Sequence, residues 1–131
     1  QLLRDLNKTI KRLVLDGRDL KLDHTNTVVR LTEALELRYL ELEELYLYKF
    51  KTNNEAVRAI SNYVKTSSLC TLYLQSCGID AASVFLIGES LQTNTSIKEL
   101  NLGSNWIGDD GAIALANALK TNQHLKKLGL A

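Results

Sequence analysis

The chain has 131 residues, of which 45% are hydrophobic and 24% are charged, and its formal net charge is +1. Because 16 Lys and Arg side chains face 15 Asp and Glu side chains, no broad attraction to phosphate backbones or anionic lipid is expected. No apolar run approaches the roughly 18 residues that span a bilayer, and no signal peptide is visible. The composition therefore argues against nucleic acid or a membrane as the partner.

Taken from the N-terminus, the apolar residues first indicate the tail of a helix at Leu2, Leu3 and Leu6. Alternating apolar residues then predict a strand with Ile10, Leu13 and Leu15. A helix face follows, with apolar residues three and four apart at Val28, Leu31 and Leu35. This first unit is longer than the later ones, so we expect the surplus to form a loop, with His24 inside it.

The same strand-and-helix unit recurs along the rest of the chain. Leu72, Leu100 and Leu128 are 28 residues apart, and Leu45 precedes Leu72 by 27. Residues 69–79 have the pattern L-x-x-L-x-L-x-x-C-x-I, and residues 97–107 have I-x-x-L-x-L-x-x-N-x-I. The chain is therefore predicted to be a repeat protein of about four and a half units.

The residue that ends each strand carries a structural prediction. Cys77 and Asn105 occupy this turn position, where a polar side chain can satisfy backbone groups that the turn leaves unpaired. Phe50 occupies it in the earlier copy, so the loop there is expected to take a different path.

Each turn is followed by a helical pattern. The predicted buried faces are Val57, Ile60 and Val64, then Val84, Ile87 and Leu91, then Ala112, Leu115 and Leu119. Asp80 is expected to cap its helix, and Asp109 and Asp110 place negative charge at the start of the last one. Asn94 and Asn122 should end their helices, since Asn tolerates a left-handed turn.

Few residues suggest reaction chemistry. His24 and His124 are too far apart in a repeat array to share a site, and no phosphate loop, metal spacing or nucleophile and base pair is visible. Cys70 and Cys77 are interpreted as unpaired structural thiols, and the triplets that begin at Asn7 and Asn94 as turn residues rather than glycosylation sites. We therefore expect no enzyme, no cofactor, no metal and no small-molecule substrate.

Strand alternation turns the residues beside the leucines to the exposed side of the sheet. One predicted row is Val14, Tyr46, Tyr73, Asn101 and Gly129. The flanking rows are Arg12, Glu44, Thr71, Glu99 and Lys127 on one side, and Asp16, Tyr48, Gln75, Gly103 and Ala131 on the other. Tyr46 is expected to touch Tyr73, with charge pairs between Arg12 and Glu44 and between Glu99 and Lys127. Gly103, Gly129 and Ala131 should leave a shallow open region.

Two interpretations of the aromatic residues remain open. Tyr46, Tyr48 and Tyr73 form either a recognition surface or a simple cover for the sheet, because tyrosine favours strands in any case. Trp106 replaces the Gly78 of the preceding unit, so it should lie on the rim, in contact either with a partner or with that neighbouring loop.

The repeating units, above all residues 104–112 and 115–119, resemble the ribonuclease-inhibitor-like leucine-rich repeats. The same class occurs in Nod-like receptors, activators of the Ran GTPase, tropomodulins and some bacterial effectors. The resemblance implies an α/β fold: a horseshoe solenoid with parallel inner strands and outer helices, which usually binds proteins. Secreted members usually carry cysteine caps that this chain lacks, so a cytoplasmic location is expected.

We expect residues 1–131 to form a single segment of a longer solenoid. The leading functional hypothesis is a non-catalytic scaffold that binds a protein on the strand face. Its predicted contact residues are Tyr46, Tyr48, Tyr73, Gln75, Glu99, Asn101 and Trp106. The alternatives are a small-GTPase regulator, an actin-binding module and a bacterial effector that acts on a host protein.

Overall fold

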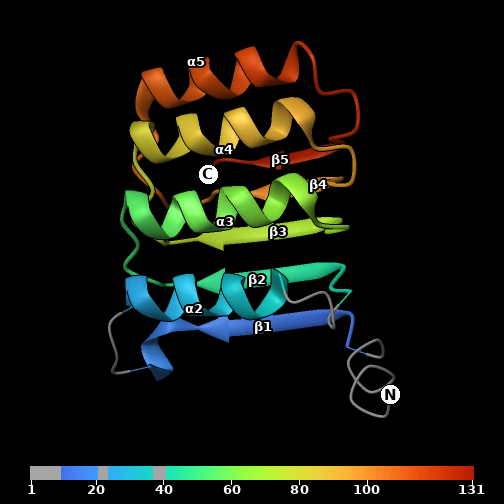
Figure 1. Ribbon diagram of the computed structural model, residues 1–131. Coiled ribbons are helices and arrows are strands. Elements are labelled where there is room, and N and C mark those ends of the chain that lie inside the picture. The colour runs from blue at the N-terminus through green and yellow to red at the C-terminus, as the bar shows by residue number, and fades with distance from the viewer. Residues whose placement is uncertain (1–9, 21–23, 37–40) are drawn as a thin grey trace.

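The computed structural model describes residues 10–20, 24–36 and 41–131. The helix tail predicted at residues 2–6 and the triplet at Asn7 lie outside this part. The described strands form one parallel sheet in chain order: β1 (Arg12–Asp16), β2 (Glu44–Tyr48), β3 (Thr71–Gln75), β4 (Glu99–Asn101) and β5 (Lys127–Gly129). The helices are α2 (His24–Glu36), α3 (Asn54–Thr66), α4 (Ala81–Thr93) and α5 (Gly108–Leu119). They stack in a row on one side of the sheet, in the same order as the strands (Figure 1).

The strand register confirms the predicted rows. Leu45 pairs with Leu72, and Leu72 with Leu100, while Tyr46 pairs with Tyr73. The unit also repeats in its hydrogen bonds, because the carbonyl oxygens of Lys11, Glu43, Cys70 and Lys98 each accept two amides from the next unit. The outward positions of the first two rows therefore lie in line across all five strands, and those of the row that contains Tyr48 lie in line across β1, β2 and β3.

The leucines of the strands and the apolar faces of the helices form the core between the two layers. Leu45, Leu47, Leu72, Leu74 and Leu100 are at most 1% exposed. The faces predicted for α3 and α4 are buried as expected. In the first unit Val28 and Leu35 are buried, with Leu31 packed against the core.

The face predicted for α5 is partly wrong. Ala112 is exposed and Leu119 is 37% exposed, whereas Gly111 and Ala118 join Leu115 in the interior. The physical reason is close approach by small residues. A Cβ added to Gly111 would lie 2.5 Å from a side-chain carbon of Ile107 and 3.5 Å from the Cα of Ala81 in α4, so only glycine fits at this buried position.

The turn after β4 confirms the role predicted for Asn105. Its Oδ1 accepts hydrogen bonds from the amides of Cys77 (2.9 Å) and Ile79 (3.0 Å). Its Nδ2 donates to the carbonyl oxygens of Leu74 and Leu102, both at 2.8 Å. One side chain thus joins two successive units. Cys77 makes a weaker version of the same link, since its Sγ donates to the Leu47 carbonyl oxygen at 3.3 Å.

Asn94 ends α4 as predicted, but α5 already ends at Leu119, and the left-handed turn predicted at both asparagines is wrong. Asn94 has φ −73°, and neither residue is among those with positive φ. Both side chains instead bridge units. Asn94 Nδ2 donates to the Val64 carbonyl oxygen and Asn122 Nδ2 to that of Leu91, each at 2.7 Å. In the described part of the chain, the left-handed residues other than glycine are Lys49, Ser76 and Ser104, which follow the strands and donate backbone hydrogen bonds to the next unit. Their residue types gave no signal of this.

The first unit, and its junction with the unit of β2, differ from the later ones. A short 3-10 helix, η1 (Gly17–Asp19), follows β1. His24 is not in a loop but begins α2. Its Nδ1 accepts a hydrogen bond from the Lys51 amide at 2.9 Å, and its ring lies 5.3 Å from that of Phe50. The imidazole of His24 and its contact with Phe50 therefore join the units of β1 and β2, whereas Asn105 joins the units of β3 and β4.

Candidate functional site

The concave face, defined here as the sheet surface opposite the helices, carries three tyrosines in contact. The ring centroids of Tyr46 and Tyr73 are 4.7 Å apart, and those of Tyr46 and Tyr48 are 6.2 Å apart. Strand alternation places Tyr48 beside Tyr46 within β2, and pairing places Tyr73 beside Tyr46 on β3. The predicted contact between Tyr46 and Tyr73 is therefore confirmed, and each ring is only partly buried.

Two glutamates hold the tyrosine hydroxyls. The Tyr73 hydroxyl donates a hydrogen bond to Glu99 Oε1, and the Tyr46 hydroxyl donates to Glu44 Oε2 at 3.5 Å. The hydrogen bond to Glu99 and partial burial raise the pKa of Tyr73 to about 12. Desolvation and the charge of Glu44 raise the pKa of Tyr46 as well. Both hydroxyls are thus neutral donors at physiological pH, with their protons committed to carboxylates.

The predicted charge pairs flank this cluster. Arg12 Nε lies 3.2 Å from Glu44 Oε2, and Lys127 Nζ lies 3.9 Å from Glu99 Oε2. The Arg12 guanidinium carbon also lies 4.7 Å from the centre of the Tyr46 ring. Charged and aromatic side chains therefore form one continuous line from β1 to β5, with a cation at each end.

The C-terminal part of the face differs from the expectation. Gly103 is buried rather than open, because a Cβ there would lie 2.4 Å from the Ala131 carbonyl oxygen. Asn101 is turned toward its own strand end, where its Oδ1 accepts from the Gly103 amide at 2.8 Å. Its side chain also lies against Gly129. A hollow of about 350 Å³ does lie on β4 and β5, lined by residues that include Glu99, Asn101 and Lys127.

Trp106 lies away from the tyrosine cluster. Its side chain is 82% exposed, so the rim position is confirmed, and its backbone amide donates to the Ile79 carbonyl oxygen at 2.8 Å. In the described part of the chain, no ring contact or hydrogen bond joins Trp106 to Tyr46, Tyr48 or Tyr73. Six of the seven predicted contact residues therefore lie on the concave face, and the seventh, Trp106, lies apart from them on the rim. Sequence reasoning omitted Arg12 and Glu44 from this set, although their place in the rows was visible.

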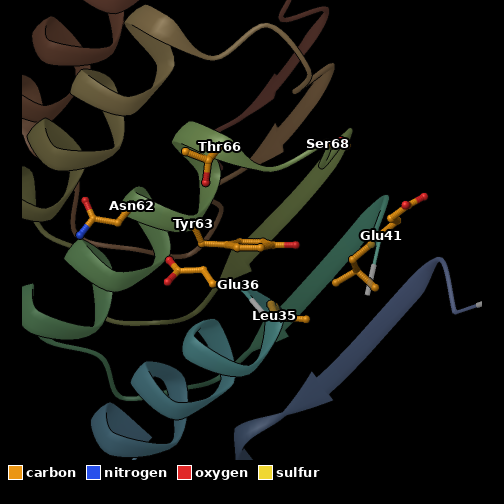
Figure 2. Close-up of a pocket in the computed structure, with 8 residues that line it drawn as sticks. Leu35, Glu36, Glu41, Asn62, Tyr63, Thr66 and Ser68 are labelled. Atoms are coloured by element: carbon orange, nitrogen blue, oxygen red, sulfur yellow. The ribbon is translucent and has the colours of Figure 1, made fainter. Parts of the chain in front are cut away.

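A second hollow lies elsewhere, between the C-terminal ends of α2 and α3. Its volume is about 570 Å³, and Figure 2 shows Tyr63 and Glu36 side by side among the residues that line it. Burial, with a smaller contribution from the charge of Glu36, raises the pKa of Tyr63. Two lining residues, Glu36 and Glu41, adjoin residues 37–40, which are outside the described part of the chain. This hollow therefore carries no functional assignment.

The remaining candidates for chemistry have structural roles. Cys70 and Cys77 are both unpaired, and burial raises the pKa of the Cys77 thiol to about 11. Asn94 is 4% exposed and hydrogen bonded, so it cannot carry a glycan in this fold. Among residues 10–20, 24–36 and 41–131, no cluster of three or more metal-binding side chains occurs, and no helix is long and apolar enough to cross a bilayer.

Parallel strands, outer helices and bridging asparagines in repeats of 27 and 28 residues define a leucine-rich repeat array of the helical class. In this respect the chain is similar to the ribonuclease-inhibitor-like leucine-rich repeats. A family model described as Leucine Rich repeat matches residues 93–116. The human NACHT, LRR and PYD domains-containing protein 13 is 32% identical over 103 residues, which cover 77% of this chain and 10% of that protein. The chain thus spans about a tenth of the length of this relative.

Two solved structures share the fold. Leiomodin-1 actin-binding site 2 superposes with a TM-score of 0.83 at 22% identity, and the match covers 98% of this chain and 75% of that one. The tropomodulin C-terminal domain from Caenorhabditis elegans gives 0.82 at 17% identity, covering 98% and 78% respectively. At these identities the likeness establishes the fold and leaves the partner open.

Proposed function

We propose that the chain is a non-catalytic protein-interaction segment that binds a protein partner on its concave face. The observation that carries this proposal is the line of contacting tyrosines and charged side chains across the sheet. The rings of Tyr46, Tyr48 and Tyr73 are rigid, partly exposed and preorganised by one another, which lowers the entropy lost on binding. Tyrosine is among the residues that contribute most to protein interfaces.

The contact set of this proposal consists of residues from three strands. It keeps Tyr46, Tyr48, Tyr73, Gln75 and Glu99, and it gives Asn101 a smaller role because its Oδ1 is already engaged. Trp106 would contribute only if the partner reaches past the sheet to the rim. The small-GTPase, actin and effector alternatives name different partners for the same face, and no side chain described here favours one of them.

A selection experiment with the chain as bait tests the proposal. Partners are selected from a displayed library of protein fragments, and their affinities are then measured for the wild type and for two single variants. Tyr48→Ala removes a ring that makes no hydrogen bond in the described part of the chain, so folding should be little affected. Phe85→Ala on α4 is the matched control, since Phe85 is 58% exposed on the helical side.

We expect Tyr48→Ala to weaken binding at least tenfold, the size of an interface hot spot, and Phe85→Ala to change it by less than about twofold. The proposal would be overturned by partners whose affinity depends on Phe85 or Trp106 and not on Tyr48. Circular dichroism of each variant would confirm that the fold is retained.

A further inference from the structure

The chemistry of the concave face also specifies what kind of group it can hold. We propose that the partner inserts an arginine side chain onto the rings of Tyr48 and Tyr73. This inference rests on the proposed function and deepens it. It follows from which donors, acceptors and charges on the face are already committed.

The two tyrosine–glutamate pairs at the centre of the face leave acceptors free but no donors. The hydroxyls of Tyr46 and Tyr73 both donate to carboxylates, so neither proton is available to a ligand. Glu44 and Glu99 accept these bonds and keep further lone pairs, since an ionised carboxylate has about four acceptor sites. Gln75, which pairs with Tyr48 in the sheet register, adds a side-chain oxygen that can accept beside an amide nitrogen that can donate. Such a surface suits a group that donates several hydrogen bonds.

The charges point to the same kind of ligand. The rows of the face hold carboxylates at Asp16, Glu44 and Glu99 and cations at Arg12 and Lys127. Asp16 is paired with Arg18 at 2.7 Å, so Glu44 and Glu99 are the carboxylates that lie beside the tyrosine rings. Both cations lie at the lateral edges, and each already faces a glutamate. An anionic group at the centre would therefore meet electron-rich rings and carboxylates, with no uncommitted cation on these rows. A cationic group would meet complementary charge.

The chain supplies an example of the same contact. Arg12 places its guanidinium 4.7 Å from the centre of the Tyr46 ring while its Nε lies 3.2 Å from Glu44. Tyr73 has the same surroundings on the other side, with a ring and a carboxylate at Glu99. In the described part of the chain, however, no cation lies over Tyr73 or Tyr48. The partner's guanidinium would complete this second arrangement.

Arginine fits these rings better than lysine does. A guanidinium is planar, stacks on aromatic faces and donates in a fork that matches a carboxylate, whereas an ammonium is a compact and strongly hydrated charge. The Tyr46 and Tyr73 rings are inclined at 56°, and the Tyr46 and Tyr48 rings at 31°. A flat cation can therefore stack on one ring and still turn its N–H groups toward Glu99 or Gln75.

The test uses three short peptides that differ at one central residue, which is arginine, lysine or citrulline. Citrulline has nearly the shape of arginine and lacks its charge. Tyrosine ring signals are followed by NMR while each peptide is added to the intact chain. We expect the arginine peptide to shift the signals of Tyr48 and Tyr73, and the citrulline peptide to bind about threefold to tenfold more weakly. Lysine should fall between them, and added salt should weaken the arginine peptide most.

Two variants distinguish the contribution of the Tyr48 ring to arginine binding from that of its hydroxyl. Tyr48→Phe keeps the ring and should keep arginine binding, whereas Tyr48→Ala should remove most of it. Equal shifts with arginine and citrulline, or no shift of either ring up to the solubility limit of the arginine peptide, would overturn this inference. In either case, library partners that depend on Tyr48 would still support a protein-binding face, so the two proposals fail separately.

Discussion

Asn105 offers the most direct test of how the array is held together, because one side chain serves two units. Asn105→Ala leaves the amides of Cys77 and Ile79 without their acceptor and three carbonyl oxygens without their Nδ2 donor. An unpaired buried amide costs about 1–3 kcal/mol. Because these groups are only partly buried, we expect the free energy of unfolding to fall by about 2–4 kcal/mol, a large share of the roughly 5–15 kcal/mol of a typical domain.

Urea unfolding followed by circular dichroism measures this loss, and amide hydrogen exchange locates it. The matched control is Asn117→Ala, because Asn117 is exposed on α5, where Ala is the better helix former. Asn105→Cys copies the residue at position 77 and should give an intermediate stability. Our account of the turn is refuted if Asn105→Ala is as stable as Asn117→Ala, or if the amides of Cys77 and Ile79 exchange at the wild-type rate.

Three further predictions concern close packing and titration. Gly103→Ala should destabilise the chain by about 1–3 kcal/mol in urea, because the new Cβ would lie 2.4 Å from a backbone carbonyl oxygen beyond β5. Gly88→Ala, whose Cβ would meet nothing closer than 3.4 Å, is the control, and an equal loss in both would contradict this reasoning. An absorbance titration should show one tyrosine with a pKa of about 12 that disappears in Tyr73→Phe. The folded chain keeps this proton at a pH where the unfolded chain has lost it, so the free energy of unfolding should decline as pH rises from about 10 toward 12. If Tyr73→Phe showed the same decline with pH as the wild type, that result would count against the bond to Glu99. A disulfide reagent should modify Cys70 in the folded chain, whereas Cys77 should react only after the chain unfolds, because its pKa of about 11 keeps the thiol protonated. Reaction of both cysteines in the folded chain would contradict the burial of Cys77.

Much of this fold could be predicted because the repeat length aligns chemically equivalent residues. Once Leu72, Leu100 and Leu128 are seen to be 28 residues apart, the order of the strands, their register and their outward rows follow. The contact between Tyr46 and Tyr73 is a consequence of that register alone. The sheet and its exposed face were therefore accessible from the sequence.

What could not be predicted depends on short-range geometry that the period does not encode. The burial of Gly111 in place of Ala112 depends on close packing at the start of α5, where a Cβ on Gly111 would meet the side chain of Ile107 and the backbone of Ala81 in α4. The left-handed turn falls on Lys49, Ser76 and Ser104, residue types that do not favour it. The direction of the Asn101 side chain, which removes it from the open part of the face, depends on a single hydrogen bond to Gly103.

The junctions between units are joined by groups of unequal strength, and this has a mechanical consequence. Among the described residues, the asparagine amides of Asn105 and Asn122 bridge the units of β3 and β4. The amide of Asn94, a thiol and a threonine hydroxyl bridge the units of β2 and β3, and an imidazole bridges those of β1 and β2. In a linear array each unit is coupled only to its neighbours, so the weakest coupling yields first under load. Stretched from its ends, this chain should detach the unit of β1 before the pair joined by Asn105 separates.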